Sequence, residues 1–115
     1  MSNSTDWFKD INCAITVCDK NGIIIYMNEK ASRTFEKWGG KELIGKSLFD
    51  CHGEKSRETI GVLMSKGGTN CYTIEKSGIK KLIYQTPWYN NGEVAGLIEY
   101  SLEIPFEMPH FNRNV

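Results

Sequence analysis

Hydrophobic and polar residues alternate along the chain in a way that separates strand-like from helix-like segments. Residues 13–18 and 23–27 have the alternation and β-branched content of strands, with an Asn-Gly pair typical of a hairpin turn between them. The last third repeats this pattern over residues 70–76, 79–88 and 93–104, which are joined by glycine-containing turns. We therefore predict two strands, a central segment, and three further strands.

The central segment has helical spacing. Asn28 is a typical helix cap, and Ala31 and Phe35 fall on one face of the helix that would follow it. Residues 41–50 predict a run of short turns, and residues 54–66 predict a longer helix with an apolar face. Strands at both ends with helices between them favour an α+β fold, in which helices cover one face of an antiparallel sheet.

A short helix is also predicted near the N-terminus, at residues 4–11. Its apolar stripe consists of Trp7, Phe8 and Ile11. Because a helix this short is marginal in water, the stripe must pack on the sheet of its own chain or on a partner.

Composition and charge exclude several classes of protein. The 115 residues fit one domain, and Lys plus Arg equals Asp plus Glu, at 14 each. A chain without basic excess is a poor candidate for binding nucleic acid or anionic lipid. No apolar run approaches the roughly 20 residues of a membrane helix, and residues 1–10 lack a signal-peptide core. We therefore expect a cytoplasmic chain without nucleic-acid or membrane partners.

Three stretches of the sequence follow one another in a recognisable order. Residues 17–28 combine a strand, an Asp-x-x-Gly turn, a second strand and a helix-capping Asn; residues 42–50 read ELIGKSLFD; and residues 86–98 hold Thr-Pro-Trp, Asn-Gly and Gly-Leu-Ile. Together they resemble the PAS family, over about residues 11–104. The chain departs from the family's closing Asp-Ile-Thr, where Leu-Glu-Ile-Pro stands, and Pro105 and Pro109 are incompatible with a following linker helix.

The resemblance implies a PAS-like five-stranded antiparallel sheet in the order 2-1-5-4-3, with helices packed on one face. It implies a bacterial-type sensory or interaction module in signal transduction, which binds a small ligand or forms a homodimer and acts on an output partner that the sequence does not name. The corresponding organisation is a cap helix at residues 1–11, a PAS domain at residues 12–104 and a tail at residues 105–115.

A ligand pocket in such a domain would lie between the concave face of the sheet and the helices. Two tyrosine hydroxyls could orient a polar group of the ligand, although the same side chains could equally fill a core. The expected lining residues are Phe35, Ile60, Met64, Ile74, Leu82, Tyr84, Trp88, Ile98 and Tyr100.

The opposite, outer face of the sheet would carry Ile83, Ala95 and Leu97 among polar residues. Apolar residues on an otherwise polar face suggest a covered patch. The N-terminal stripe of Trp7, Phe8 and Ile11 is the expected cover, within one chain or across a homodimer.

Cofactor chemistry has one candidate position. His52 precedes the longer helix, and PAS proteins that bind haem often take an axial His from a helix, so a haem-binding redox or gas sensor using His52 or Cys51 is the alternative function. Flavin is not expected, because Asn70-Cys71 keeps only the first two residues of the reactive-cysteine motif of light-sensing relatives.

The remaining chemistry predicts no catalysis. Cys13, Cys18, Cys51 and Cys71 have neither zinc nor redox spacing and are interpreted as reduced, mostly buried hydrophobic residues. No nucleophile–base pair and no phosphate-binding glycine loop is present. We expect a protein that is not an enzyme and holds no metal.

Overall fold

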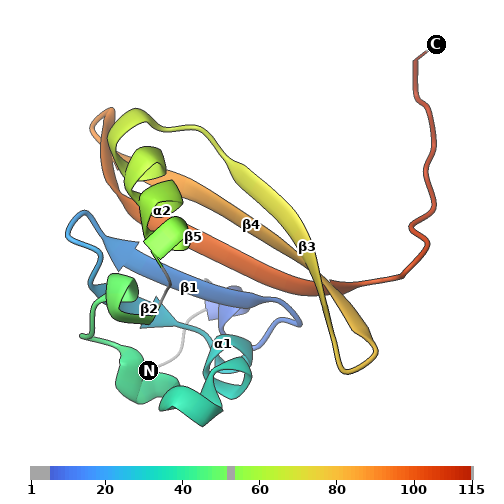
Figure 1. Cartoon of the computed structure of the whole chain (residues 1–115), viewed down its shortest axis with the longest axis horizontal. Helices are drawn as coiled ribbons and strands as arrows, with labels where there is room; N and C mark the ends of the chain where they lie inside the picture. The colour runs from blue at the N-terminus through green and yellow to red at the C-terminus, as the bar shows by residue number, and fades with distance from the viewer. Residues whose placement is uncertain (1–5, 52–53, 115) are drawn as a thin grey trace.

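In the computed structural model, which describes residues 6–51 and 54–114, five strands form one antiparallel sheet in the order β2-β1-β5-β4-β3 (Figure 1). This confirms the predicted strand order. The strands are β1 (Ala14–Asp19), β2 (Ile24–Met27), β3 (Asn70–Lys76), β4 (Ile79–Asn90) and β5 (Glu93–Ile104).

The helical segments lie mainly between the second and third strands. The predicted helix at residues 54–66 is confirmed, whereas the helix after Asn28 is shorter than expected and continues as separate 3-10 turns. The N-terminal segment forms a single 3-10 turn, and residues 4 and 5 of its predicted helix lie outside the described residues. The elements are η1 (Asp6–Lys9), α1 (Glu29–Thr34), η2 (Glu36–Trp38), η3 (Gly40–Leu43), η4 (Leu48–Cys51) and α2 (Glu54–Lys66).

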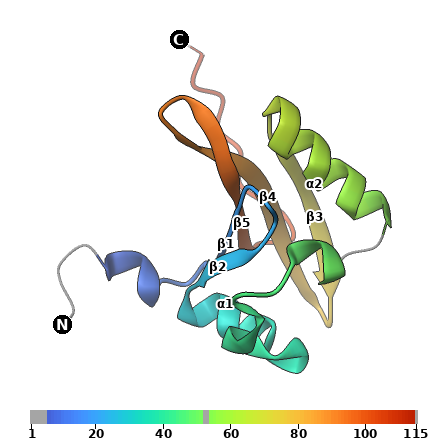
Figure 2. The ribbon, with the colours of Figure 1, turned by 90° about the vertical axis from the view of Figure 1, so that its left-hand side faces the viewer.

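Helices α1 and α2 lie on one face of the sheet and η1 lies on the other (Figure 2). Two clusters of buried side chains hold the helices in place. Near α1 the cluster is Ala14, Ile24, Met27, Ala31 and Leu43, and near α2 it is Cys18, Ile60, Leu63 and Leu97. After β5 the chain runs on as an extended tail (Figure 1).

For β4 and β5, the two faces of the sheet were assigned the wrong way round from the sequence. Leu97 is 2% exposed and packs against Ile60 and Leu63 of α2, so the face predicted as outer is the face that the helices cover. Tyr100, predicted to face the helices, instead lines a groove with residues of η1 on the opposite face. Both alternating sets in β5 contain apolar residues, and the set with more of them is the one that is only partly covered.

Gly96 marks the closest approach between β5 and β1. A Cβ atom at this position would lie 1.9 Å from the carbonyl oxygen of Cys18 and 2.5 Å from Nε1 of Trp88. The Trp88 indole N–H donates to the same carbonyl, at 3.0 Å. The absence of a side chain at Gly96 therefore allows Trp88 to lie across the outer face and reach β1.

Among the helices of the described ranges, none has the length and apolar character that a membrane crossing requires.

Candidate functional site

A polar pocket opens between α2 and the β3–β4 edge of the sheet. Its volume is about 270 Å³, and its lining comes from three elements. Lys55 and Thr59 project from α2, Asn70 and Tyr72 from β3, and Gln85 from β4. The pocket therefore lies where a movement of the first turns of α2 would change its shape.

Three polar side chains form a hydrogen-bonded relay at the base of this pocket. Asn70, Gln85 and Glu99 lie directly opposite one another on β3, β4 and β5. Asn70 Nδ2 donates to Gln85 Oε1 at 2.9 Å, and Gln85 Nε2 donates to Glu99 Oε2 at 2.7 Å. Gln85 is only 4% exposed, so these bonds replace the hydrogen bonds to water that its amide loses on burial.

Tyr72 adds a hydroxyl to the pocket. Burial raises the pKa of Tyr72, and the negative charge of Glu99 raises it further. Both effects keep the phenol protonated, so its hydroxyl can either donate or accept a hydrogen bond. The chemical groups around the pocket are thus amides, hydroxyls and one ammonium, which suit recognition through hydrogen bonds.

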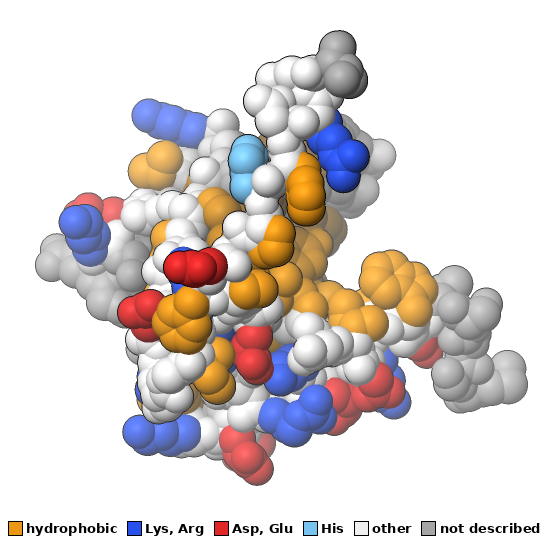
Figure 3. Space-filling view, turned by 90° about the vertical axis from the view of Figure 1, so that its right-hand side faces the viewer, with side chains coloured by type: hydrophobic (Ala, Val, Ile, Leu, Met, Phe, Trp, Pro, Cys, Tyr) orange, Lys and Arg blue, Asp and Glu red, His pale blue; other side chains and the backbone are white. Residues whose placement is uncertain are grey.

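An apolar groove of about 440 Å³ occupies the outer face of the sheet, between η1 and the strands. Hydrophobic side chains gather in the hollow between the N-terminal segment and the C-terminal tail (Figure 3). Trp7 stands at the edge of the groove and is 68% exposed. The lining consists of Trp7, Phe8, Ile11, Ile15, Val17, Tyr26 and Tyr100.

Tyr26 anchors η1 to this face through an edge-to-face contact with Phe8, at a ring-centroid distance of 5.6 Å. The Tyr26 hydroxyl is buried, and no residue within 6–51 or 54–114 bonds to it. Burial raises the pKa of Tyr26, so the hydroxyl stays neutral over the physiological range.

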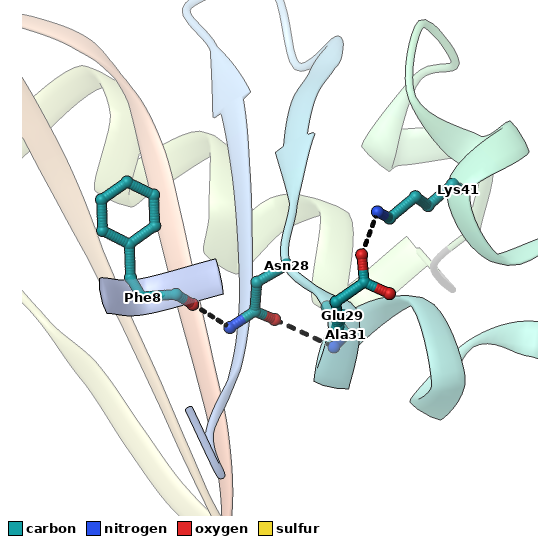
Figure 4. Close-up of polar contacts among 5 residues, drawn as sticks. All are labelled: Phe8, Asn28, Glu29, Ala31 and Lys41. Carbon is teal, nitrogen blue, oxygen red and sulfur yellow. Dashed lines mark hydrogen bonds and ion pairs between the residues drawn. The ribbon is translucent and has the colours of Figure 1, made fainter. Parts of the chain in front are cut away.

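Asn28 connects the two faces (Figure 4). Its side chain is buried, and its Nδ2 donates to the carbonyl oxygens of Phe8, at 2.9 Å, and Cys13, at 2.8 Å. Its Oδ1 accepts from the backbone N–H groups of Ile15 and Ala31, each at 3.0 Å. One amide therefore caps α1 and also holds η1 and the start of β1, which confirms the predicted cap and adds a tertiary role.

An ion pair lies beside this junction. Lys41 from η3 contacts the carboxylate of Glu29, the first residue of α1 (Figure 4). The hydrogen bond and positive charge of Lys41 lower the pKa of Glu29. The pair is exposed and therefore contributes little to stability on its own.

The structure divides the predicted pocket residues between the two faces. Phe35, Ile60 and Met64 belong to the helical side, as expected, and Ile74 lies on the helix-facing side of β3 but is largely exposed. The prediction that one pocket brings all nine together was wrong, because alternation places the rest on the outer face. These are Leu82, Tyr84, Trp88, Ile98 and Tyr100.

The predicted interface set is divided in the same way. Trp7, Phe8 and Ile11 do lie on the outer face, where they line the groove. Ile83 and Leu97, however, are buried on the helix-facing side. Ala95 is the extra residue at a bulge, because Trp88 pairs with Gly96 and Tyr89 with Val94. The stripe therefore borders a groove with Ile15 and Val17 and does not lie on the predicted patch.

The haem alternative stays a prediction. His52 lies outside the described residues, and of Cys51 the structure describes only its place at the end of η4. Within the described ranges, no group of three or more His, Cys, Asp and Glu residues could hold a metal ion. The predicted burial is found for Cys18, whereas Cys13 is partly buried and Cys71 is exposed.

A family model described as PAS fold matches residues 8–66, slightly more than half of the chain. A search among curated proteins found no match. Similar solved structures share 11–20% identity with this chain, which supports a common fold.

Three of these structures illustrate the likeness. The Aer2 receptor of Vibrio cholerae, described as a dual PAS-heme oxygen sensor, aligns with a TM-score of 0.61 at 19% identity, over 81% of this chain and 95% of that one. The PAS domain of histidine kinase ThkA gives 0.65 at 19%, over 79% and 98%. Vibrio cholerae VqmA gives 0.65 at 17%, over 85% and 48%, so this chain spans about half the length of VqmA.

Proposed function

Because the chain belongs to the PAS fold family, we propose that it is a sensory and interaction module of a signalling protein, acting by binding and not by catalysis. Its signal is a small ligand in the pocket between α2 and the sheet. Its output is a contact to a second copy through the outer face. The observation that carries the proposal is the partly buried relay of Asn70, Gln85 and Glu99 at the base of an open pocket.

A satisfied relay around the buried Gln85 amide adds little stability beyond that of a plain apolar core. Burying an amide without hydrogen bonds costs about 1–3 kcal/mol, and replacing a satisfied polar network by apolar side chains of the same shape is nearly neutral. A polar network under a pocket is therefore better explained by ligand recognition than by stability. VqmA, which has the same fold, has been solved bound to DPO.

The attachment of α2 gives the ligand a way to act. Ile60 and Leu63 hold the second half of the helix against Cys18 and Leu97, whereas Lys55 and Thr59, in its first half, border the pocket. A ligand that contacts Thr59 would favour one position of these first turns over another. Such a preference shifts the population of two states by the difference in affinity between them.

The outer groove is suited to a second copy of the chain. Its lining is almost entirely apolar, and Trp7 exposes most of its surface. Apolar surface contributes about 25 cal/mol per Å² when it is removed from water, and a stable interface needs roughly 800 Å² per partner. The zero net charge of the chain removes long-range repulsion between copies. VqmA is described as a dimer.

The proposal is tested by sedimentation velocity combined with native mass spectrometry of protein purified without denaturation. We expect a concentration-dependent dimer that Trp7→Glu converts to a monomer. We also expect a bound small molecule that is lost when Thr59→Phe fills the pocket and kept in Ser65→Phe, a control at an exposed position of the same helix. A wild-type protein that stays monomeric and carries no bound mass would contradict the proposal.

A further inference from the structure

We infer that the pocket between α2 and the sheet selects uncharged small molecules that present hydrogen-bond donors, such as primary amides or amino-heterocycles, over carboxylates and phosphates. The inference rests on the proposed function, since it concerns the ligand of the same pocket. It follows from the direction in which the hydrogen bonds of the relay run.

Glu99 sets that direction. A carboxylate can only accept hydrogen bonds, so the group of Gln85 that faces it must be the NH₂ and not the carbonyl. The Gln85 Nε2–Glu99 Oε2 distance of 2.7 Å is that of a strong, charge-assisted bond. The amide of Gln85 is thereby fixed with its carbonyl oxygen turned toward β3.

The same reasoning extends to the next residue of the relay. Because Gln85 presents its carbonyl oxygen, Asn70 must donate to it, as its Nδ2 does at 2.9 Å. The carbonyl oxygen of Asn70, Oδ1, then accepts no hydrogen bond from the other two side chains of the relay. Both residues line the pocket, so a ligand there meets amides whose orientation is fixed from below.

Thr59 contributes an acceptor from the helical side. Its hydroxyl donates its one proton to the carbonyl oxygen of Lys55, at 3.2 Å, which leaves its lone pairs free to accept. Acceptors on α2, β3 and β4 thus surround one space, and a ligand with N–H or O–H groups satisfies them. Each NH₂ group of the relay also keeps a second N–H, to which a carboxylate or phosphate could bind, but such an anion has no donor for the oxygen acceptors and leaves them unpaired.

The charges near the pocket favour an uncharged ligand. Lys55 is an exposed, solvated cation at the rim, and Glu99 is the carboxylate below Gln85. Lys55 is the one charged residue among the described residues that line the pocket, and an exposed ammonium contributes little to binding an anion. Tyr72 can donate or accept, so it does not oppose the selection.

The test uses nicotinamide and nicotinate as probes, because they share a ring and differ in whether they present an NH₂ donor or a carboxylate. The side-chain amide resonances of Asn70 and Gln85 are followed by ¹⁵N NMR at pH 7.5 during titration of the ¹⁵N-labelled full chain. We expect saturable shifts of both amides with nicotinamide, at a dissociation constant at least about tenfold lower than that of nicotinate, which is about 1.4 kcal/mol.

Glu99→Gln is the variant that removes the fixed direction of the hydrogen bonds in the relay. A glutamine at this position can donate as well as accept, so the relay is no longer fixed in one direction, and the preference for nicotinamide should fall below about threefold. Glu103→Gln is the matched control: it makes the same change on the same strand, where Glu103 lies at the surface 3.6 Å from Lys30 Nζ. This control should keep the preference of the wild type.

Three results would overturn the inference, and the first two separate it from the proposed function. If nicotinate shifts the amides of Asn70 and Gln85 as strongly as nicotinamide, the ligand class is wrong while the pocket stands as a binding site. If neither probe shifts these amides at millimolar concentration, the pocket itself is refuted as a ligand site. A preference that survives in Glu99→Gln would show that the relay does not set the selectivity.

Discussion

Asn28 offers the sharpest test of how the two faces of the sheet are joined. Replacing it by Asp keeps an oxygen acceptor for the N–H groups of Ile15 and Ala31 and is neutral at helix caps, where Asn and Asp rank equally. The change removes only the NH₂ that donates to Phe8 and Cys13. It therefore separates the attachment of η1 from the capping of α1.

The magnitude follows from the two lost bonds. Each buried carbonyl left without a donor costs about 1–3 kcal/mol, and the new carboxylate faces both oxygens, so Asn28→Asp should lose about 2–6 kcal/mol of unfolding free energy. Asn28→Ala also loses the cap, which adds about 1 kcal/mol, and leaves the Ile15 N–H unpaired. Each kcal/mol lowers the midpoint of thermal unfolding by about 4 °C in a domain of this size.

The assay combines urea denaturation with hydrogen exchange of residues 6–13. Exchange over this segment should accelerate at least about tenfold in Asn28→Asp, while exchange in α2 stays close to that of the wild type. Asn91→Asp is the control, because it makes the same change at an exposed turn residue whose positive φ of 53° Asp also tolerates. If Asn28→Asp matches this control in stability and in exchange of residues 6–13, Asn28 does not hold η1 and the reasoning fails.

Three further predictions concern the core. Gly96→Ala should lower the free energy of unfolding by about 3 kcal/mol or more in urea denaturation, since its methyl group would lie 1.9 Å from the Cys18 carbonyl oxygen. The control is Gly61→Ala in α2, whose methyl group meets nothing within 4 Å and should raise that free energy by about 0.5–1 kcal/mol. Equal effects of the two substitutions would refute this account of Gly96. Burial raises the pKa of the Cys18 thiol, so iodoacetamide should label the exposed Cys71 well before Cys18, and the reverse order would contradict that burial. Because the pKa of Cys18 is higher in the folded state than in the unfolded state, this thiol makes stability depend on pH. Its contribution is complete below the unfolded-state pKa, about 8.5, and is lost as pH rises through the higher folded-state pKa. The free energy of unfolding should therefore decline above about pH 8.5, and less so in Cys18→Ala.

Local signals made most of the fold predictable from the sequence. The helix cap at Asn28 and the glycine turns mark where elements begin and end, and these signals act over only a few residues. The bounds of β3, β5 and α2 were therefore predicted correctly. The N-terminal helix was overestimated because Asn28, 20 residues away, holds Phe8 and no local signal reports that bond.

The polar pocket was not predictable because it depends on the pairing of distant residues. The bulge at Trp88 and Tyr89 shifts β5 by one residue against β4 and places Glu99 opposite Gln85. An unbroken hairpin around the same turn would pair Gln85 with Ile98, and no polar relay would form. The alternation in β5 also gave the wrong face, because a half-covered outer face can hold as many apolar residues as a buried one.

The central claim is that ligands enter on the helix-covered face and that the outer groove is reserved for a protein contact. The most direct measurement is ¹H–¹⁵N NMR of the labelled chain against a library of small fragments, with each shifted resonance assigned to its residue. The account predicts that perturbations gather at Thr59, Asn70 and Gln85. Perturbations that gather instead at Trp7 and Tyr100 of the outer groove would contradict it.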